Sequence, residues 1–169
     1  IEPEIIKYRR DFHKHAESGW NEYRTASIIA RRLEELGYEI KLGRDVVDEK
    51  SRMGLPAPEV MEKQYERALA EGADRKYASL FKGGFAGVVA ELSNGRGPTI
   101  GFRFDIDAVE MAENPGDGHL PAAGGFVSIH SEAMHSCGHD GHASMGLGLA
   151  EVLMRDRKST RMNSSHRIR

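Results

Sequence analysis

The chain has 169 residues, enough for one domain with a hydrophobic core. Its 24 basic and 26 acidic residues give a formal net charge of −2, so it has no overall basic field of the kind that binds nucleic acid. No run of eighteen apolar residues and no apolar signal-peptide core is present, and the one cysteine cannot form an internal disulfide. We therefore expect a cytoplasmic protein without nucleic-acid or membrane partners.

The helices and strands expected from the sequence alternate along the chain. Apolar residues at helical spacing, with Pro3 in a first turn and Gly37 at a helix end, indicate the first two helices. The expected helices cover residues 2–16, a segment capped at Asn21 or Thr25 and ended by Gly37, and residues 58–72, 74–81 and 138–155. The expected strands cover residues 38–42, 87–92 and 99–105, with loops over 43–58 and 112–135. This alternation favours an α/β layer architecture.

The last fourteen residues differ in charge from the rest of the chain. They hold five basic residues and one acid, and without them 19 basic and 25 acidic residues remain, a net charge of −6. Residues 156–166 resemble the translation of a sequencing-library adapter, from which they depart at Met162. We therefore predict a native segment over residues 1–155 and a non-native basic tail over 156–169. A nucleic-acid-binding arm is the alternative.

Metal-ligating residues gather in one short segment. His130, His135, His139 and His142 lie there with Cys137, the only cysteine. Thiolate and imidazole groups suit Zn²⁺ and neighbouring divalent ions. Cys137 and His139 stand two apart where a predicted helix begins, and His139 and His142 stand three apart, on one face of that helix. The segment therefore predicts a metal site, and the absence of paired cysteines argues against a structural zinc site.

A second group of polar residues, Asp105 and Asp107, follows the predicted strand over 99–105. In α/β sheets, ligands bind outside the carboxyl ends of strands. With one residue between them, the two carboxylates point to opposite sides if the strand continues. We therefore expect them to lie near a site without sharing a role.

Three segments resemble motifs of the M20 metallopeptidase superfamily, in its amidohydrolase branch. The sequence HSCGHDGHASMGLGLA at 135–150 resembles its M-H-x-C-G-H-D-x-H motif, and FRFDIDAVE at 102–110 resembles its R-x-D-x-D-A segment. RRDFHKHAESGWNE at 9–22 resembles R-R-x-x-H-x-x-P-E, with Ala16 where proline is usual. Residues 43–86 are most similar to the p-aminobenzoyl-glutamate hydrolases of that branch. The resemblance covers residues 1–155 and implies the N-terminal part of a three-layer α/β/α metallohydrolase catalytic domain.

The same resemblance implies two divalent metal ions, Zn²⁺ or Mn²⁺, which polarise an amide carbonyl and lower the pKa of a shared water to roughly 7. By it, Cys137 and His139 are metal ligands, and Asp107 orients a ligand through a hydrogen bond. Further supporting positions are expected at Asp105, Asp140 and His142. His13 and Glu17 match the N-terminal motif, which implies proximity to the site without a defined role.

The implied reaction is hydrolysis of the amide bond in an N-acyl amino acid or a p-aminobenzoyl-glutamate-type substrate. The glutamate that serves as general base in the family, the later metal ligands and a smaller dimerisation domain are not present in this chain. We therefore expect residues 1–169 alone to be inactive, and the longer protein to be a homodimer or a heterodimer with a related subunit. Two alternatives are a cysteine hydrolase, with Cys137 as nucleophile and His139 or His142 as base, and a non-catalytic metal-binding module.

Overall fold

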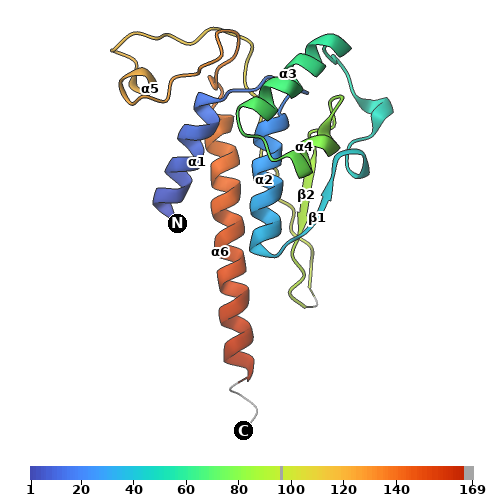
Figure 1. Cartoon of the computed structure of the whole chain (residues 1–169). Helices are drawn as coiled ribbons and strands as arrows, with labels where there is room; N and C mark the ends of the chain where they lie inside the picture. Colours follow the sequence, from blue (N-terminus) through green and yellow to red (C-terminus); the bar gives the residue numbers. More distant parts are fainter. Residues whose placement is uncertain (96, 166–169) are drawn as a thin grey trace.

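The computed structural model describes residues 1–95 and 97–165, with side chains as far as residue 157. Figure 1 shows α1, α6 and α2 side by side, with α3, α4 and a small sheet packed on the other side of α2. The helices are α1 (Glu2–Lys14), α2 (Tyr23–Leu36), α3 (Pro58–Ala70), α4 (Arg75–Phe81), α5 (Leu120–Ala123) and α6 (His139–Ser165). The strands are β1 (Glu39–Leu42) and β2 (Val88–Glu91), and two 3-10 turns, η1 (Gly43–Asp45) and η2 (Glu49–Ser51), follow β1.

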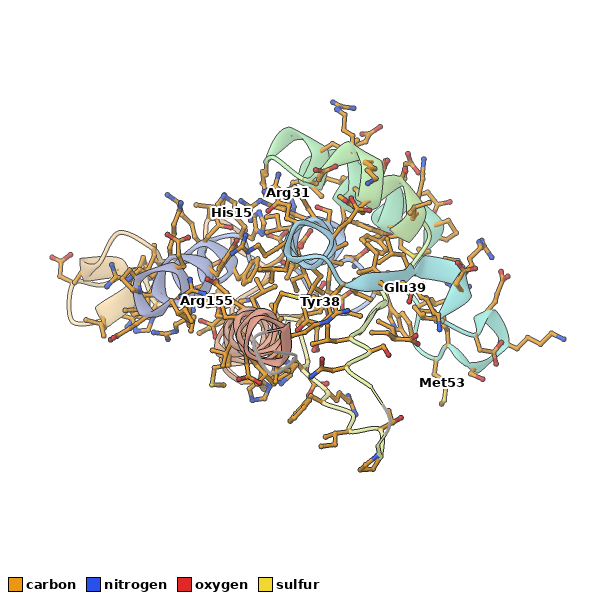
Figure 2. All side chains as sticks on the ribbon, turned by 90° about the horizontal axis from the view of Figure 1, so that it is seen from below. His15, Arg31, Tyr38, Glu39, Met53 and Arg155 are labelled. Carbon is orange, nitrogen blue, oxygen red and sulfur yellow. The ribbon has the colours of Figure 1, made fainter. Side chains whose placement is uncertain are left out.

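The sheet of β1 and β2 is antiparallel and packs its apolar face against the helices. Ile40 lies opposite Ala90 and Leu42 opposite Val88, and all four side chains are partly buried. The residues between them point to the other face and are exposed, as the two-residue period of a strand requires. Figure 2 shows the strands at the side of the helices, with Glu39 where the chain leaves α2. Within the described residues, the helices therefore cover one face of this sheet.

Two hydrophobic clusters meet at α2 and join the elements into one body. One cluster contains Tyr23 and Phe81 and connects α2 with α3 and α4. The other contains Phe12 and Leu147 and connects α2 with α1 and α6. Ile40 of β1 packs against both clusters, so the sheet and both helix groups share a core. The N-terminal part of α6 is thereby held against α1 and α2.

The end of α2 agrees with the sequence prediction, but its start does not. Gly37 ends the helix in the left-handed conformation, at φ 94°. The helix begins at Tyr23, and neither Asn21 nor Thr25 caps it. Instead, the carboxylate of Glu17 accepts hydrogen bonds from the backbone N–H groups of Arg24 at 2.9 Å and Thr25 at 2.8 Å. The cap therefore comes from a residue outside the helix, which the expected local pattern does not include.

The predicted strand over 99–105 is wrong. Within the described part of the chain, residues 98–107 form no backbone–backbone hydrogen bond, because no neighbouring strand offers the ladder partners. Single bridges follow this segment, pairing Ala108 with Ser18 and Val109 with Met134. Ile100 and Phe102 on the segment remain exposed. The segment is therefore irregular, and the backbone bridges that fix it follow its C-terminal end.

Helix α6 extends beyond the predicted end at residue 155 and continues to Ser165. No glycine or proline occurs between residues 149 and 165, so the sequence offers no strong stop signal there. Part of the predicted tail is therefore helical, while residues 166–169 lie outside the described residues. The non-native origin of the tail stays a prediction.

The glycines of α6 allow close packing against α1 and against the irregular segment before Asp105. A Cβ atom added at Gly148 would lie 2.5 Å from Cδ1 of Ile5, and one at Gly146 would lie 2.9 Å from the Phe104 ring. Because Gly148 has no side chain, α6 can lie directly against α1 at this point. None of the described helices combines the length and apolar character that crossing a membrane requires.

Candidate metal centre

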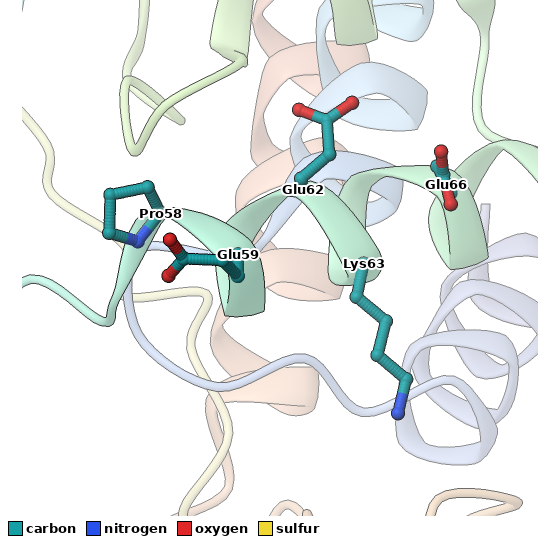
Figure 3. Close-up of a pocket in the computed structure, with 5 residues that line it drawn as sticks. All are labelled: Pro58, Glu59, Glu62, Lys63 and Glu66. Atoms are coloured by element: carbon teal, nitrogen blue, oxygen red, sulfur yellow. The ribbon is translucent and has the colours of Figure 1, made fainter.

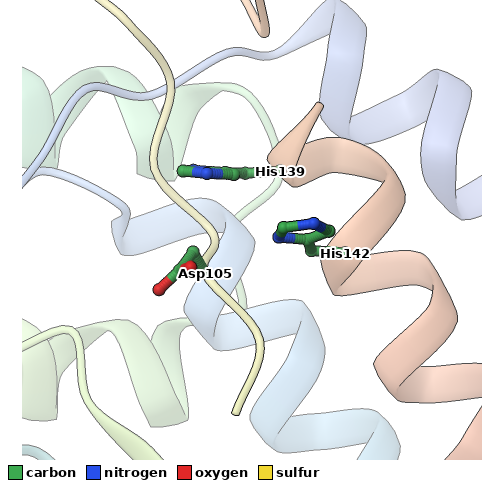
Figure 4. Close-up of side chains that lie close together, drawn as sticks. All are labelled: Asp105, His139 and His142. Atoms are coloured by element: carbon green, nitrogen blue, oxygen red, sulfur yellow. The ribbon is translucent and has the colours of Figure 1, made fainter. Parts of the chain in front are cut away.

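Three potential metal ligands from two segments converge at the start of α6. Each of Asp105, His139 and His142 offers one ligand atom, and these atoms lie within 4.8 Å of one another. Figure 4 shows both imidazole rings projecting from the first turn of α6 towards the segment that carries Asp105. The rings are stacked with their centroids 5.1 Å apart, which confirms that His139 and His142 share a helix face. Two imidazole nitrogens and a carboxylate oxygen are a suitable donor set for Zn²⁺ or Mn²⁺.

Asp107 contacts the ring of His139 at Nδ1. Nδ1 of His139 lies 2.9 Å from Oδ1 of Asp107 and 3.0 Å from the Asp107 backbone oxygen. Because Nδ1 carries the proton that these oxygens accept, Nε2 is left as the free electron-pair donor. This contact is the one that the supporting role implied for Asp107 requires, and the role itself stays a prediction. Asp105 and Asp107 thus serve one histidine pair in different ways, with Asp105 offering a ligand atom and Asp107 orienting a ring.

Cys137 lies outside this group in the structure. Its side chain is exposed, and Gly138 turns the chain at φ 83° between Cys137 and His139. No hydrogen bond among the described residues joins the Cys137 thiol to a histidine. The assignment of Cys137 as a metal ligand stays a prediction, and the structure instead brings Asp105 and His142 to ligand distance.

Two other histidines of the segment have different surroundings. His130 is buried, with Nδ1 2.6 Å from the Ala16 oxygen and Nε2 2.9 Å from Oε1 of Glu71, so it connects this loop to the segment after α1 and to the end of α3. His135 is buried, and neither of its ring nitrogens has a partner among the described residues. Burial lowers the pKa of His135 to about 4, so its ring is neutral at pH 7.

Asp140 and His13 form a buried pair on the side of α6 that faces α1. Oδ2 of Asp140 lies 2.9 Å from Nδ1 of His13 and 3.2 Å from Nε of Arg9. The other ring nitrogen of His13, Nε2, lies 2.8 Å from Oε1 of Glu113. His13 therefore does adjoin the candidate site, as its motif implied, but through Asp140.

Glu17 and Glu22 are buried carboxyl groups with different roles. Glu17 caps α2, so the motif match at this position has a structural explanation. Glu22 was not singled out from the sequence. Burial raises its pKa to about 8, and the negative charges of Glu17 and Asp107 add to the shift. Glu22 is therefore mostly protonated at pH 7. The effect of the Asp107 charge on Glu22 arises from the fold, so the sequence pattern gives no sign of it.

The hollow on α3 shown in Figure 3 is separate from this centre. It lies on the outer surface of the helix and shares no residue with the group of Asp105, His139 and His142. Its lining residues are Pro58, Glu59, Glu62, Lys63 and Glu66. It has no feature that supports a site.

Comparison with known proteins shows what this chain is similar to. Residues 101–166 match the model of peptidase family M20/M25/M40. The chain is 48% identical over 154 residues to a subunit of the p-aminobenzoyl-glutamate hydrolase of Escherichia coli strain K12, covering 90% of this chain and 35% of that protein. It is 50% identical over 152 residues to indole-3-acetyl-aspartic acid hydrolase of Enterobacter agglomerans, covering 89% of this chain and 35% of that protein.

A solved structure agrees with these sequence matches. The crystal structure of an aminobenzoyl-glutamate utilization protein from Klebsiella pneumoniae superimposes with a TM-score of 0.70 at 45% identity, covering 90% of this chain and 32% of that one. The chain is thus similar to peptidase family M20/M25/M40 over residues 101–166, and to these hydrolases over about nine tenths of its own length. It has the α/β fold of the N-terminal part of that family's catalytic unit, and it spans about a third of the length of these relatives.

Proposed function

We propose that this chain is part of a metal-dependent amidohydrolase that cleaves the amide bond of an N-acyl amino acid or a p-aminobenzoyl-glutamate-type substrate. The observation that carries the proposal is the group of Asp105, His139 and His142, with Asp107 hydrogen-bonded to His139. The names of two relatives add support, because each specifies hydrolysis of an amide of glutamate or aspartate.

The chain's own residues would hold and orient the metal. Asp105, His139 and His142 would bind a divalent ion, and Asp107 would keep Nε2 of His139 directed at it. When bound, divalent ions of this kind polarise an amide carbonyl and make hydroxide available near neutral pH. We propose two ions, Zn²⁺ or Mn²⁺, with Cys137 as a further ligand.

The alternative of a cysteine hydrolase has less support from the geometry. A nucleophilic cysteine needs a base within hydrogen-bond reach, and the described hydrogen bonds include none between Cys137 and His139 or His142. The thiol is exposed, whereas the imidazole rings lie against Asp105 and Asp107. A non-catalytic metal-binding module would use the same three ligands and would differ only in lacking turnover.

We further propose that the longer protein acts in the cytoplasm on a small-molecule amide, as a homodimer or together with a related subunit. The E. coli relative is named as one of the subunits of its hydrolase, which supports a multi-subunit assembly. The formal net charge of −2 is compatible with a small-molecule substrate and gives no general attraction for nucleic acid.

Metal binding by the 169-residue chain tests the site directly. Calorimetric titration with Zn²⁺ and Mn²⁺ should show binding that His139→Ala weakens by about 100-fold or more, because a ligand is removed. The matched control is His15→Asn. The ring of His15 contacts the backbone oxygen of Asp11 in α1, and none of its described hydrogen bonds involves the three potential ligands. Equal affinity of the wild type and His139→Ala would contradict the proposed site.

Hydrolysis is measured on the natural protein that contains this chain, with p-aminobenzoyl-glutamate and N-acyl amino acids as substrates. Removal of metal with EDTA should abolish activity, and Zn²⁺ or Mn²⁺ should restore it. Activity that survives EDTA but is lost on thiol alkylation would establish the cysteine hydrolase instead. Metal binding without hydrolysis of any amide would favour the non-catalytic module.

A further inference from the structure

His13 bridges two buried carboxylates that belong to different segments. Nδ1 faces Oδ2 of Asp140 at 2.9 Å, and Nε2 faces Oε1 of Glu113 at 2.8 Å. The side chains of Asp140 and Glu113 are 1% and 2% exposed, so each depends on its protein partners for hydrogen bonds. Only the imidazolium form donates from both ring nitrogens. Burial by itself would lower the pKa of His13, but the bonds to the two carboxylates raise it above its usual value.

The two contacts of His13 lead to separate parts of the fold. Glu113 also accepts hydrogen bonds from His119 at 2.7 Å and from the Ser128 backbone N–H at 2.6 Å, so it organises the loop between residues 112 and 135. Asp140 is the second residue of α6 and follows the candidate ligand His139 directly. One side of the ring therefore holds a loop, and the other side holds the turn that carries the metal ligands.

The first turn of α6 is fixed from two directions. On one side Asp107 binds Nδ1 of His139, and on the other Arg9 and His13 of α1 bind Asp140. Because His139 and Asp140 are consecutive, a rotation of this turn that keeps one set of bonds breaks the other. His142, three residues after His139, moves with the same turn.

We propose that His13 is a positioning residue for the metal centre, acting through its Nδ1 contact with Asp140 to set the direction of the His139 and His142 rings. The inference rests on the metal site of the proposed function. It assigns to α1 a role in that site although α1 supplies none of its three potential ligands. The Nε2 contact with Glu113 holds the loop and contributes little to ligand direction.

Two substitutions separate the halves of this bridge. His13→Asn places an amide nitrogen near the position of Nδ1, which keeps the donor to Asp140 and removes the one to Glu113. His13→Gln places its amide nitrogen near the position of Nε2, which keeps the donor to Glu113 and removes the one to Asp140. Glu113→Gln is the matched control, because it weakens the loop contact from the other partner and leaves Asp140 untouched.

The experiment uses the full 169-residue chain with Co²⁺ as the spectroscopic probe. His13→Gln should lower Co²⁺ affinity by about 10- to 100-fold and change the visible d–d spectrum, because supporting hydrogen bonds tune both ligand direction and affinity. His13→Asn and Glu113→Gln should retain the wild-type spectrum and affinity within about threefold. A general loss of stability would affect all three variants alike. It would not single out His13→Gln, the variant that lacks the donor to Asp140.

A second readout needs no metal. Imidazole NMR signals of His139 and His142 in the metal-free chain should shift in His13→Gln and stay in place in His13→Asn. If His13→Gln does not fold, Asp140→Asn carries the same test, since it weakens this contact without changing side-chain volume and should give a smaller loss of the same sign. Equal behaviour of His13→Asn and His13→Gln, or unchanged ring signals in the folded variant that loses the Asp140 contact, would overturn the proposal. A wild-type chain that binds no Co²⁺ would overturn the metal site alone, because the ring signals still report on positioning.

Discussion

Oδ1 of Asp107 lies 2.9 Å from Nδ1 of His139, a contact between residues 32 positions apart in the sequence. The bond selects one tautomer of His139 and leaves Nε2 free. Because Asp107 is in the segment that also carries Asp105, the same stretch of chain offers one potential ligand and orients another. The pairing predicts how the centre responds when Asp107 is altered.

Asp107→Ala should weaken Zn²⁺ binding by about 10- to 100-fold while leaving the three ligands in place. Asp107→Asn should have a smaller effect, because an amide oxygen still accepts from Nδ1–H but carries no charge. Competition with a chromophoric chelator measures the affinities. The control is Asp117→Ala, an exposed aspartate on the following loop. A loss as large in Asp117→Ala as in Asp107→Ala would show that the effect is general and not local.

The thiol of Cys137 provides an independent test of its predicted part in metal binding. Because the side chain is exposed in the structure, a thiol reagent such as Ellman's reagent should label the metal-free chain readily. Saturation with Zn²⁺ should slow labelling at least tenfold if Cys137 becomes a ligand, since a bound thiolate no longer attacks the reagent freely. His139→Ala should not be protected. Unchanged labelling in a zinc-saturated chain would exclude Cys137 from the ligand set.

Glu17 should contribute to the stability of the fold and not to metal binding or catalysis. Glu17→Ala leaves two backbone N–H groups at the start of α2 without acceptors and should lower the free energy of unfolding by about 1–3 kcal/mol. Glu17→Gln keeps one acceptor oxygen and should lose less. Urea unfolding measures both. Glu59→Ala, at an exposed position in α3, should change stability by no more than about 0.5 kcal/mol.

The pair of Asp11 and Arg24 predicts a specific loss of stability in acid. Nη1 and Nη2 of Arg24 donate to Oδ2 and Oδ1 of Asp11 at 2.8 and 2.9 Å, and Nε donates to the Glu71 oxygen at 2.9 Å. Burial by itself would raise the pKa of Asp11, but the hydrogen bonds from His15 and Arg24 hold it well below its usual value. The stabilisation is therefore present above the unfolded-state pKa of about 3.9 and is lost as the pH falls below it.

Asp11→Asn tests this sign, because the asparagine cannot titrate. The difference in unfolding free energy between the wild type and Asp11→Asn should be constant from about pH 5 to pH 7 and should shrink below about pH 4. Urea unfolding at a series of pH values gives the comparison. A difference that grows as the pH falls would contradict the depressed pKa of Asp11.

Local signals account for much of what the sequence predicts correctly. Gly37 ends α2, and the spacing of His139 and His142 puts both rings on one helix face. The strand expected over 99–105 does not form, and local signals could not show this. Strand formation needs a neighbouring chain to accept the backbone hydrogen bonds, and the described residues provide none beside this segment.

The sequence by itself predicted a metal centre, because a short run of histidines, a cysteine and aspartates carries donor types that suit Zn²⁺ or Mn²⁺. Only the tertiary structure decided which side chains meet. It placed Asp105 beside His139 and His142, turned Asp140 towards His13, and used Glu17 as a helix cap. Contacts such as that between His13 and Asp140, 127 residues apart, depend on how α1 packs against α6, and that packing arises from apolar burial across the whole core and not from any local pattern.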